Sequence, residues 1–185
     1  NCDFVLVGKQ KKELKDHIQK KLNKFENKYF YGKEFQVTKS LKNKFEMKVD
    51  GKKFLYTQPS LNGKHQEENA SISIYFAKIM KKMGYKLNTK EINTAIKKTV
   101  WPGRLEIINY KNKKIILDGS HNIDGADKLN EFLKTKRIKP IVLFGMLNNK
   151  KASLFLNKIK KRVSKVLAIK IPDEKNAFKT KQINE

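Results

Sequence analysis

Apolar and polar positions follow two different periods in the first part of the chain. An apolar run at residues 4–7 predicts a short buried strand close to the start. Residues 44–58 hold two β-rich runs on either side of Asp50-Gly51, and Asp-Gly supports the positive φ angles of a tight hairpin turn. Between them, a helix is predicted because four apolar residues recur at spacings of four, four and three: Leu14, Ile18, Leu22 and Phe25.

A polar loop at residues 61–69 should lead into a long helix that ends at Gly84, which suits the C′ position of a helix. Asn88 and Glu91 have the spacing of a capping box, and they predict a shorter helix at residues 90–99. The inward face of the long helix should hold Ala70, Ile74, Ala77 and Met80. The Pro102-Gly103 pair then breaks the pattern, so we predict two domains, residues 1–101 and 102–185.

Strands and helices alternate after this break. Apolar runs predict strands at 104–110, 113–119, 140–146 and 165–171, and amphipathic patterns predict helices at 122–135 and 150–162. The first of these helices should turn Ala126, Leu129, Phe132 and Leu133 inward. The strand at 140–146 lacks polar alternation, so we expect it to be buried on both faces. The order of elements predicts an α/β domain with a mainly parallel sheet and right-handed crossovers.

The formal net charge of +25 raises the question of nucleic-acid binding, since a basic surface gains affinity by releasing counterions from phosphates. All but three of the 43 basic residues are lysines, whereas nucleic-acid sites usually rely on arginine, whose planar fork holds phosphates and guanine. The lysines are spread along the whole chain. We therefore favour a compositional bias and expect no nucleic-acid partner, with a basic binding module as the alternative from a different class.

The lengths of the apolar runs and the cysteine content limit the class of protein further. No apolar run approaches the roughly 20 residues that span a membrane, and no charged-then-apolar leader opens the chain. The single Cys2 allows no internal disulfide and no metal-ligand pair. We therefore expect a cytoplasmic protein without a membrane partner and without a metal site of its own in these residues. Because the chain begins with Asn1 and enters a strand at once, we also expect an internal fragment.

The segment ILDGSHN places an acid, a histidine and an asparagine where a predicted strand ends and a helix begins. Ligands of open parallel sheets gather beyond the carboxyl ends of the strands, and a helix start offers unpaired N–H groups. Asp118 could accept a hydrogen bond from a ribose hydroxyl or a metal-bound water, and His121 could donate to a phosphate. The alternative is that Asp118 and Asn122 only cap the helix.

Arg104 and Asn69 are the other candidates. Arg104 is an arginine in a chain that otherwise uses lysine, and it lies at the break between the predicted domains. Its guanidinium could reach a triphosphate held by the neighbouring domain, or it could pair with Glu106 for a structural purpose. Asn69, in GKHQEENA, could bind a purine edge through its amide, although a polar loop with a helix cap is the simpler explanation.

Together these motifs resemble one family. WPGRLE, DGSHN, FGMLNNKK and IPDEKNA occur in the order and spacing of the folylpolyglutamate synthase/dihydrofolate synthase family of the Mur ligase superfamily. GKHQEENA and DFVLVGKQ also look like segments of that family, so the resemblance covers essentially the whole chain. It implies the tail of a central ATPase domain at 1–101, followed at 102–185 by a Rossmann-like glutamate-ligase domain truncated at its end.

The resemblance also implies an activity. The enzyme would be an ATP-dependent ligase of folate biosynthesis and one-carbon metabolism, joining L-glutamate to a folate or dihydropteroate carboxylate through an acyl phosphate. Arg104, Asp118 and His121 would be catalytic, Arg104 and Asp118 would contact ATP, and Asn69 would lie near the adenine. ATP and Mg²⁺ would be the cofactors, and the protein would be a monomer.

Two points qualify what this chain could do by itself. The family's G-x-x-x-x-G-K-[ST] loop is absent from the sequence, and the family's magnesium ligands are expected upstream. The fragment alone should therefore be inactive. A peptidoglycan-precursor amino-acid ligase is the alternative within the same superfamily.

Overall fold

The computed structural model describes residues 3–179, and the chain divides into two compact units. Unit 1 comprises residues 1–101 and unit 2 comprises residues 102–185. The division falls in the Val100–Gly103 segment, where Val100 and Trp101 are largely exposed. Each unit has a hydrophobic core of its own.

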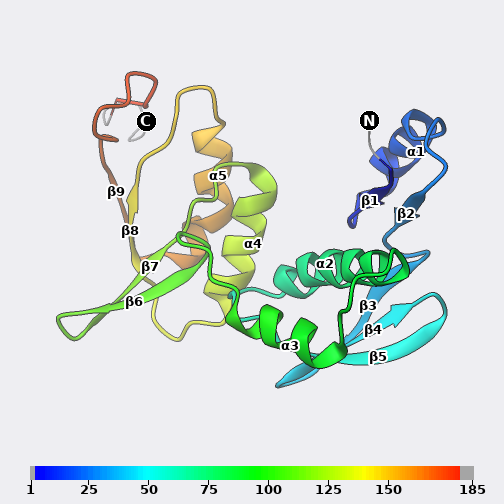
Figure 1. Ribbon diagram of the computed structural model, residues 1–185. Coiled ribbons are helices and arrows are strands. Elements are labelled where there is room, and N and C mark those ends of the chain that lie inside the picture. The colour runs from blue at the N-terminus through cyan, green and yellow to red at the C-terminus, as the bar shows by residue number, and fades with distance from the viewer. Residues whose placement is uncertain (1–2, 180–185) are drawn as a thin grey trace. The chain divides into compact units, whose positions relative to one another are not determined.

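Unit 1 combines a parallel strand pair, an antiparallel sheet and three helices (Figure 1). Strands β1 (Val5–Val7) and β2 (Lys28–Phe30) pair in parallel, with helix α1 (Lys12–Lys21) between them in the chain. An antiparallel sheet follows, made of β3 (Phe35–Ser40), β4 (Lys44–Val49) and β5 (Lys52–Thr57). Helices α2 (His65–Lys82) and α3 (Thr89–Lys98) complete the unit. Its core contains Phe35, Phe45, Met47, Val49, Tyr56, Ile74, Tyr75, Ile79 and Ile96.

Local signals in unit 1 are confirmed. The hairpin turn between β4 and β5 has positive φ at both Asp50 (44°) and Gly51 (84°), as an Asp-Gly turn requires. Gly84 follows α2 with φ of 98°, and Asn88 and Glu91 form the reciprocal capping box of α3.

The predicted helix between the first strand and the hairpin is confirmed as α1, which ends at Lys21, before Leu22 and Phe25, and has no buried residue, with Leu14 49% exposed. One expectation about unit 1 is wrong. Helix α2 begins at His65, so the GKHQEENA segment is its first turns rather than a loop. The helix buries Ser71, Ile74, Tyr75 and Ile79, one step around from the expected face.

Unit 2 follows the predicted order of elements (Figure 1). It contains β6 (Glu106–Tyr110), β7 (Lys113–Leu117), α4 (Ile123–Lys134), β8 (Ile141–Phe144), α5 (Ala152–Ile159), a 3₁₀ turn η1 (Lys160–Arg162) and β9 (Lys165–Ala168). Helix α4 buries Ala126, Phe132 and Leu133, as its pattern predicts, and packs with α5 over the core. The core also includes Leu105, Phe144, Met146, Ala152, Phe155, Ile159 and Val163.

The α/β class is confirmed, but the strands of unit 2 do not form one parallel sheet. Among residues 102–179, only β8 and β9 pair in parallel, whereas β6 and β7 form a separate antiparallel pair. The reason is their short connection, since Lys111 and Asn112 both have positive φ and make a two-residue hairpin turn. Strand β8 is also not buried on both faces, because Ile141 is 61% and Leu143 is 65% exposed.

Candidate active site

The WPGRLE motif forms a tight turn at the start of unit 2. Gly103 and Leu105 both have positive φ, 69° and 49°, and the Gly103 N–H donates to the Glu106 carboxylate at 2.8 Å. A left-handed backbone costs a non-glycine residue roughly 1–2 kcal/mol. Leu105 is only 3% exposed within the unit 2 core, so burial of its side chain offsets this cost. Arg104, between these two residues, is exposed.

Asp118 ties the WPGRLE turn to the end of β7. One carboxylate oxygen accepts from the Leu105 N–H and the other from the Ser120 N–H, both at 3.1 Å. The neighbouring Gly119 N–H donates to the Gly103 carbonyl at 2.7 Å. Asp118 is therefore not a helix cap. It holds the backbone on either side of Arg104 in a fixed place beside the DGSHN turn.

The DGSHN turn leads directly into α4. Asn122 is the N-cap of this helix and accepts from the Gly125 N–H at 2.7 Å. His121 is exposed, and its Nδ1 lies 3.0 Å from the Gly119 carbonyl oxygen. That contact requires Nδ1 to carry a hydrogen, which leaves Nε2 of the neutral ring as an acceptor. Of the two residues in the capping alternative, Asn122 therefore caps the helix and Asp118 does not.

The geometry brings the backbones of Arg104, Asp118 and His121 together within unit 2. Glu106 is used by the Gly103 N–H, and among residues 3–179 the Arg104 guanidinium has no ion-pair partner. An exposed guanidinium and the positive end of α4 suit an anion such as a phosphate.

Asn69 belongs to unit 1, where it lies on α2 and is exposed. Its Nδ2 donates to Oε1 of Gln66 at 3.0 Å, and Gln66 Nε2 lies 3.1 Å from Nε2 of His65. A cavity of about 410 Å³ between α2 and α3 is lined by both Gln66 and Asn69. Sequence reasoning gave Gln66 no role, because it placed this segment in a loop rather than in a helix with a buried side.

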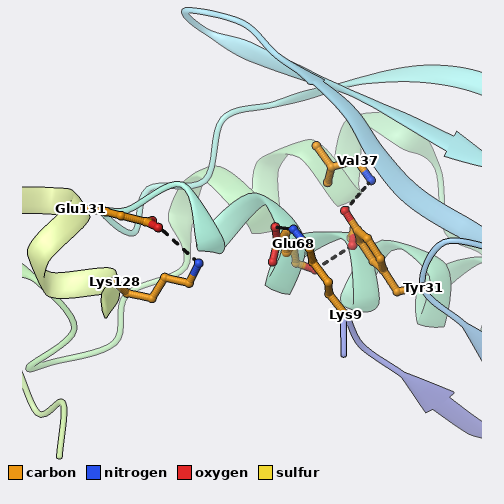
Figure 2. Close-up of polar contacts among 7 residues, drawn as sticks. Lys9, Tyr31, Val37, Glu68, Lys128 and Glu131 are labelled. Carbon is orange, nitrogen blue, oxygen red and sulfur yellow. Dashed lines mark hydrogen bonds and ion pairs between the residues drawn. The ribbon is translucent and has the colours of Figure 1, made fainter. Parts of the chain in front are cut away.

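The first turn of α2 is anchored to both sheets of unit 1. The Glu67 carboxylate, 6% exposed, accepts from the Ser40 hydroxyl at 2.5 Å and from the Gln58 amide at 2.6 Å. Glu68 pairs with Lys9, which follows β1, at 2.7 Å (Figure 2). The contacts of Glu67 and Glu68 hold the helix turn that carries Asn69.

Figure 2 also shows the Val37 N–H donating to the Tyr31 hydroxyl. Burial raises the pKa of Tyr31.

Within residues 3–179, no group of three or more His, Cys, Asp or Glu side chains could hold a metal ion. The Mg²⁺ implied by the family resemblance therefore finds no matching set of ligands in the described part of the chain. In the same range, no helix is long and apolar enough to cross a membrane.

Comparison with known proteins first defines the class. No family model matches the chain. Solved structures share its fold along nearly its whole length. A folylpolyglutamate synthase from Mycobacterium tuberculosis, complexed with ADP and AMPPCP, matches 96% of this chain with a TM-score of 0.81 at 18% identity. One from Thermotoga maritima matches 97% with a TM-score of 0.71 at 26% identity. This chain covers 41% and 43% of those two chains.

Curated relatives show the same resemblance in sequence. The chain is 32% identical over 109 residues to the dihydrofolate synthase/folylpolyglutamate synthase of Bacillus subtilis, and 31% identical over 120 residues to the folylpolyglutamate synthase of Lacticaseibacillus casei. These alignments cover 57% and 64% of the chain, and 25% and 28% of the relatives. The predicted resemblance to folylpolyglutamate and dihydrofolate synthases is confirmed. The chain spans about a quarter of the length of these relatives.

Proposed function

We propose that this chain is part of an ATP-dependent ligase that adds L-glutamate to a folate or dihydropteroate carboxylate. One observation carries the proposal. Asp118 accepts hydrogen bonds from both the WPGRLE turn and the DGSHN turn, and Arg104 and His121 lie exposed in these turns, near the start of α4. Relatives with these names support it. In this proposal residues 1–101 belong to a central ATP-binding domain and residues 102–185 to the ligase domain of a cytoplasmic, monomeric enzyme.

The chemistry has two steps. The carboxylate of the acceptor attacks the γ-phosphorus of ATP, which gives an acyl phosphate and releases ADP. The amine of L-glutamate then attacks the acyl carbon, loses a proton and displaces phosphate, which leaves an amide. Both steps develop charge on phosphoryl oxygens, where a positioned guanidinium lowers the barrier.

Each site residue has a role in this proposal. Arg104 contacts the ATP phosphates, because arginine is always charged and presents several donors. Asp118 contributes to nucleotide binding and fixes the Arg104 turn through its two N–H contacts. His121 faces the reacting groups, and Asn69 binds the adenine. Mg²⁺ would neutralise phosphate charge when bound, but the described residues offer no ligand set for it, so no step is assigned to it.

In the test, the segment of the Bacillus subtilis relative that should carry the G-x-x-x-x-G-K-[ST] loop is fused to the start of this chain. Glutamate-dependent ADP release is measured with dihydropteroate and with tetrahydrofolate as acceptors. We expect turnover that requires one of these acceptors and falls at least about 100-fold in Arg104→Ala. Arg137→Ala, which removes an exposed arginine outside the site, should leave turnover unchanged. Activity only with a muramyl-peptide precursor, or no use of ATP, would overturn the proposal.

A further inference from the structure

Gln66 is a buried polar side chain that the proposed function does not use. It is 6% exposed in the first turn of α2, yet both ends of its amide are occupied. Oε1 accepts from Asn69 Nδ2 at 3.0 Å, and Nε2 donates to His65 Nε2 at 3.1 Å. When His65 has its hydrogen on Nδ1, its Nε2 accepts from Gln66 and turns Gln66 Oε1 towards Asn69.

The direction of these two hydrogen bonds determines whether Asn69 presents its amide oxygen or its amide nitrogen to a ligand. The oxygen and nitrogen of an amide lie on opposite branches of a planar group. Because Nδ2 is turned back towards Gln66, Oδ1 of Asn69 is the branch left facing away from it. Asn69 is exposed and lines the cavity between α2 and α3, so its second amide branch is available as an acceptor.

The neighbouring cavity has the character of a site for a flat apolar ring. It measures about 410 Å³, and α2 contributes Ala70, Ser73, Ile74 and Ala77 to its wall beside the two amides. Helix α3 supplies Ile92, Ala95 and Ile96 on the opposite side. An apolar hollow with a few convergent polar groups is the usual form of a small-molecule site.

We propose that Gln66 is a positioning residue that makes this site select a 6-amino purine over a 6-oxo purine. It holds Asn69 so that Oδ1 accepts from the 6-amino group of a base lying against the apolar wall. A 6-oxo purine would set its own oxygen against Oδ1, and two acceptors cannot share a hydrogen bond. The inference rests on the proposed function, which assigns the adenine of ATP to Asn69, and adds how the base is distinguished.

The experiment compares adenosine with inosine, which differ at this ring edge. Both nucleosides are neutral, so attraction of phosphates to the many lysines does not contribute. Dissociation constants are measured on the full 185-residue chain by saturation-transfer NMR titration. We expect adenosine to bind about tenfold more tightly than inosine, as one well-placed amide contact allows.

The variants separate positioning from general structure. Gln66→Leu should bring the adenosine-to-inosine ratio close to one by weakening adenosine alone. Gln66→Glu should keep the wild-type ratio, because a carboxylate still accepts from Asn69 Nδ2. Gln19→Leu removes a glutamine from α1, outside this network, and should change nothing. Asn69→Leu alters an exposed residue and provides a second test if Gln66→Leu does not fold.

The outcomes are distinct. An unchanged ratio in Gln66→Leu or in Asn69→Leu would overturn the inference, as would equal weakening of both nucleosides. Equal binding of the two nucleosides by the wild-type chain would overturn it as well and leave the proposed function standing. Binding of neither nucleoside would remove the adenine site from the proposed function, and this inference with it.

Discussion

At the scale of single residues, Asp118 acts on the backbone as much as it offers a carboxylate to a ligand. An Asp118→Asn side chain keeps only one oxygen, so either the Leu105 or the Ser120 N–H loses its partner. An unpaired buried donor costs about 1–3 kcal/mol. We expect amide hydrogen exchange at Leu105 or Ser120 to become at least about tenfold faster, as measured by NMR.

The matched control for this prediction is Asp127→Asn. Asp127 forms an ion pair with Lys158 at 3.0 Å, and both side chains are more than 40% exposed. Such a pair is worth about 0–1 kcal/mol, so exchange around residues 103–120 should stay as in the wild type. Unchanged exchange at both amides in Asp118→Asn would contradict the role assigned to the carboxylate.

The sequence singled out Arg104, Asp118 and His121 by their residue type and their motifs, but it did not predict the contacts that these segments make. The positive φ of Leu105 and the bond from its N–H to Asp118 could not be found, because they join groups thirteen residues apart through the folded backbone. Gln66 was missed for the same reason, since its burial depends on where α2 begins.

At the scale of secondary-structure elements, Asp50 joins the β4–β5 turn to α2. Its carboxylate accepts from the Tyr75 hydroxyl at 2.9 Å and pairs with Lys78. Burial acts to raise the pKa of Asp50, but the hydrogen bonds from Lys78 and Tyr75 and the charges of Lys78 and Lys82 outweigh it and lower the pKa. The ionised carboxylate therefore favours the folded state.

This lowered pKa predicts a pH-dependent effect of Asp50→Asn. The contribution of the carboxylate is present above its ordinary pKa and is lost as the pH falls through the lowered value in the folded state. Asp50→Asn should cost about 0.5–1 kcal/mol at neutral pH, because the pair is about one-third exposed. In urea unfolding, the difference from the wild type should disappear in strong acid. A difference that is constant with pH would show that the turn itself, not the charge, is responsible.

The two faces of β8 provide a second test at this scale. Phe144 is 6% exposed and contacts the Phe155 ring, with 5.6 Å between centroids, whereas Leu143 is 65% exposed. Phe144→Ala should lower the free energy of unfolding of unit 2 by about 3–5 kcal/mol, and Leu143→Ala by less than about 1 kcal/mol. Urea unfolding followed by the NMR signals of unit 2 measures both. Equal costs would mean that the face with Leu143 is covered in solution.

Local signals therefore predicted which helices and turns form, but they did not always predict which face of an element is covered. The Asp50-Gly51 turn, the Asn88 capping box and the inward face of α4 follow from residues close in sequence. The exposure of β8 and of α1 depends on which distant segments cover them, and no periodicity records that. The antiparallel pairing of β6 and β7 was predictable, because only Lys111 and Asn112 separate the two strands.

At the scale of the whole molecule, the charge is a property of the chain rather than of the site. The chain has 43 basic and 18 acidic residues. In residues 3–179 the acidic groups form a few ion pairs, most of them at partly exposed positions such as Lys9–Glu68 and Lys53–Glu46. Pairs of this kind contribute little. Repulsion among the remaining lysines therefore outweighs them, and it acts on both units alike.

This balance predicts that salt stabilises the protein. The screening length falls from about 30 Å at 0.01 M salt to about 8 Å at 0.15 M, which weakens lysine repulsion more than the short ion pairs. If screening is worth about 1 kcal/mol in each unit, Tm should rise by about 5 °C between these conditions. Thermal unfolding followed by circular dichroism measures the rise, and sodium fluoride should match sodium chloride at equal ionic strength if screening alone is responsible. A Tm that falls with salt would mean that the ion pairs outweigh the repulsion.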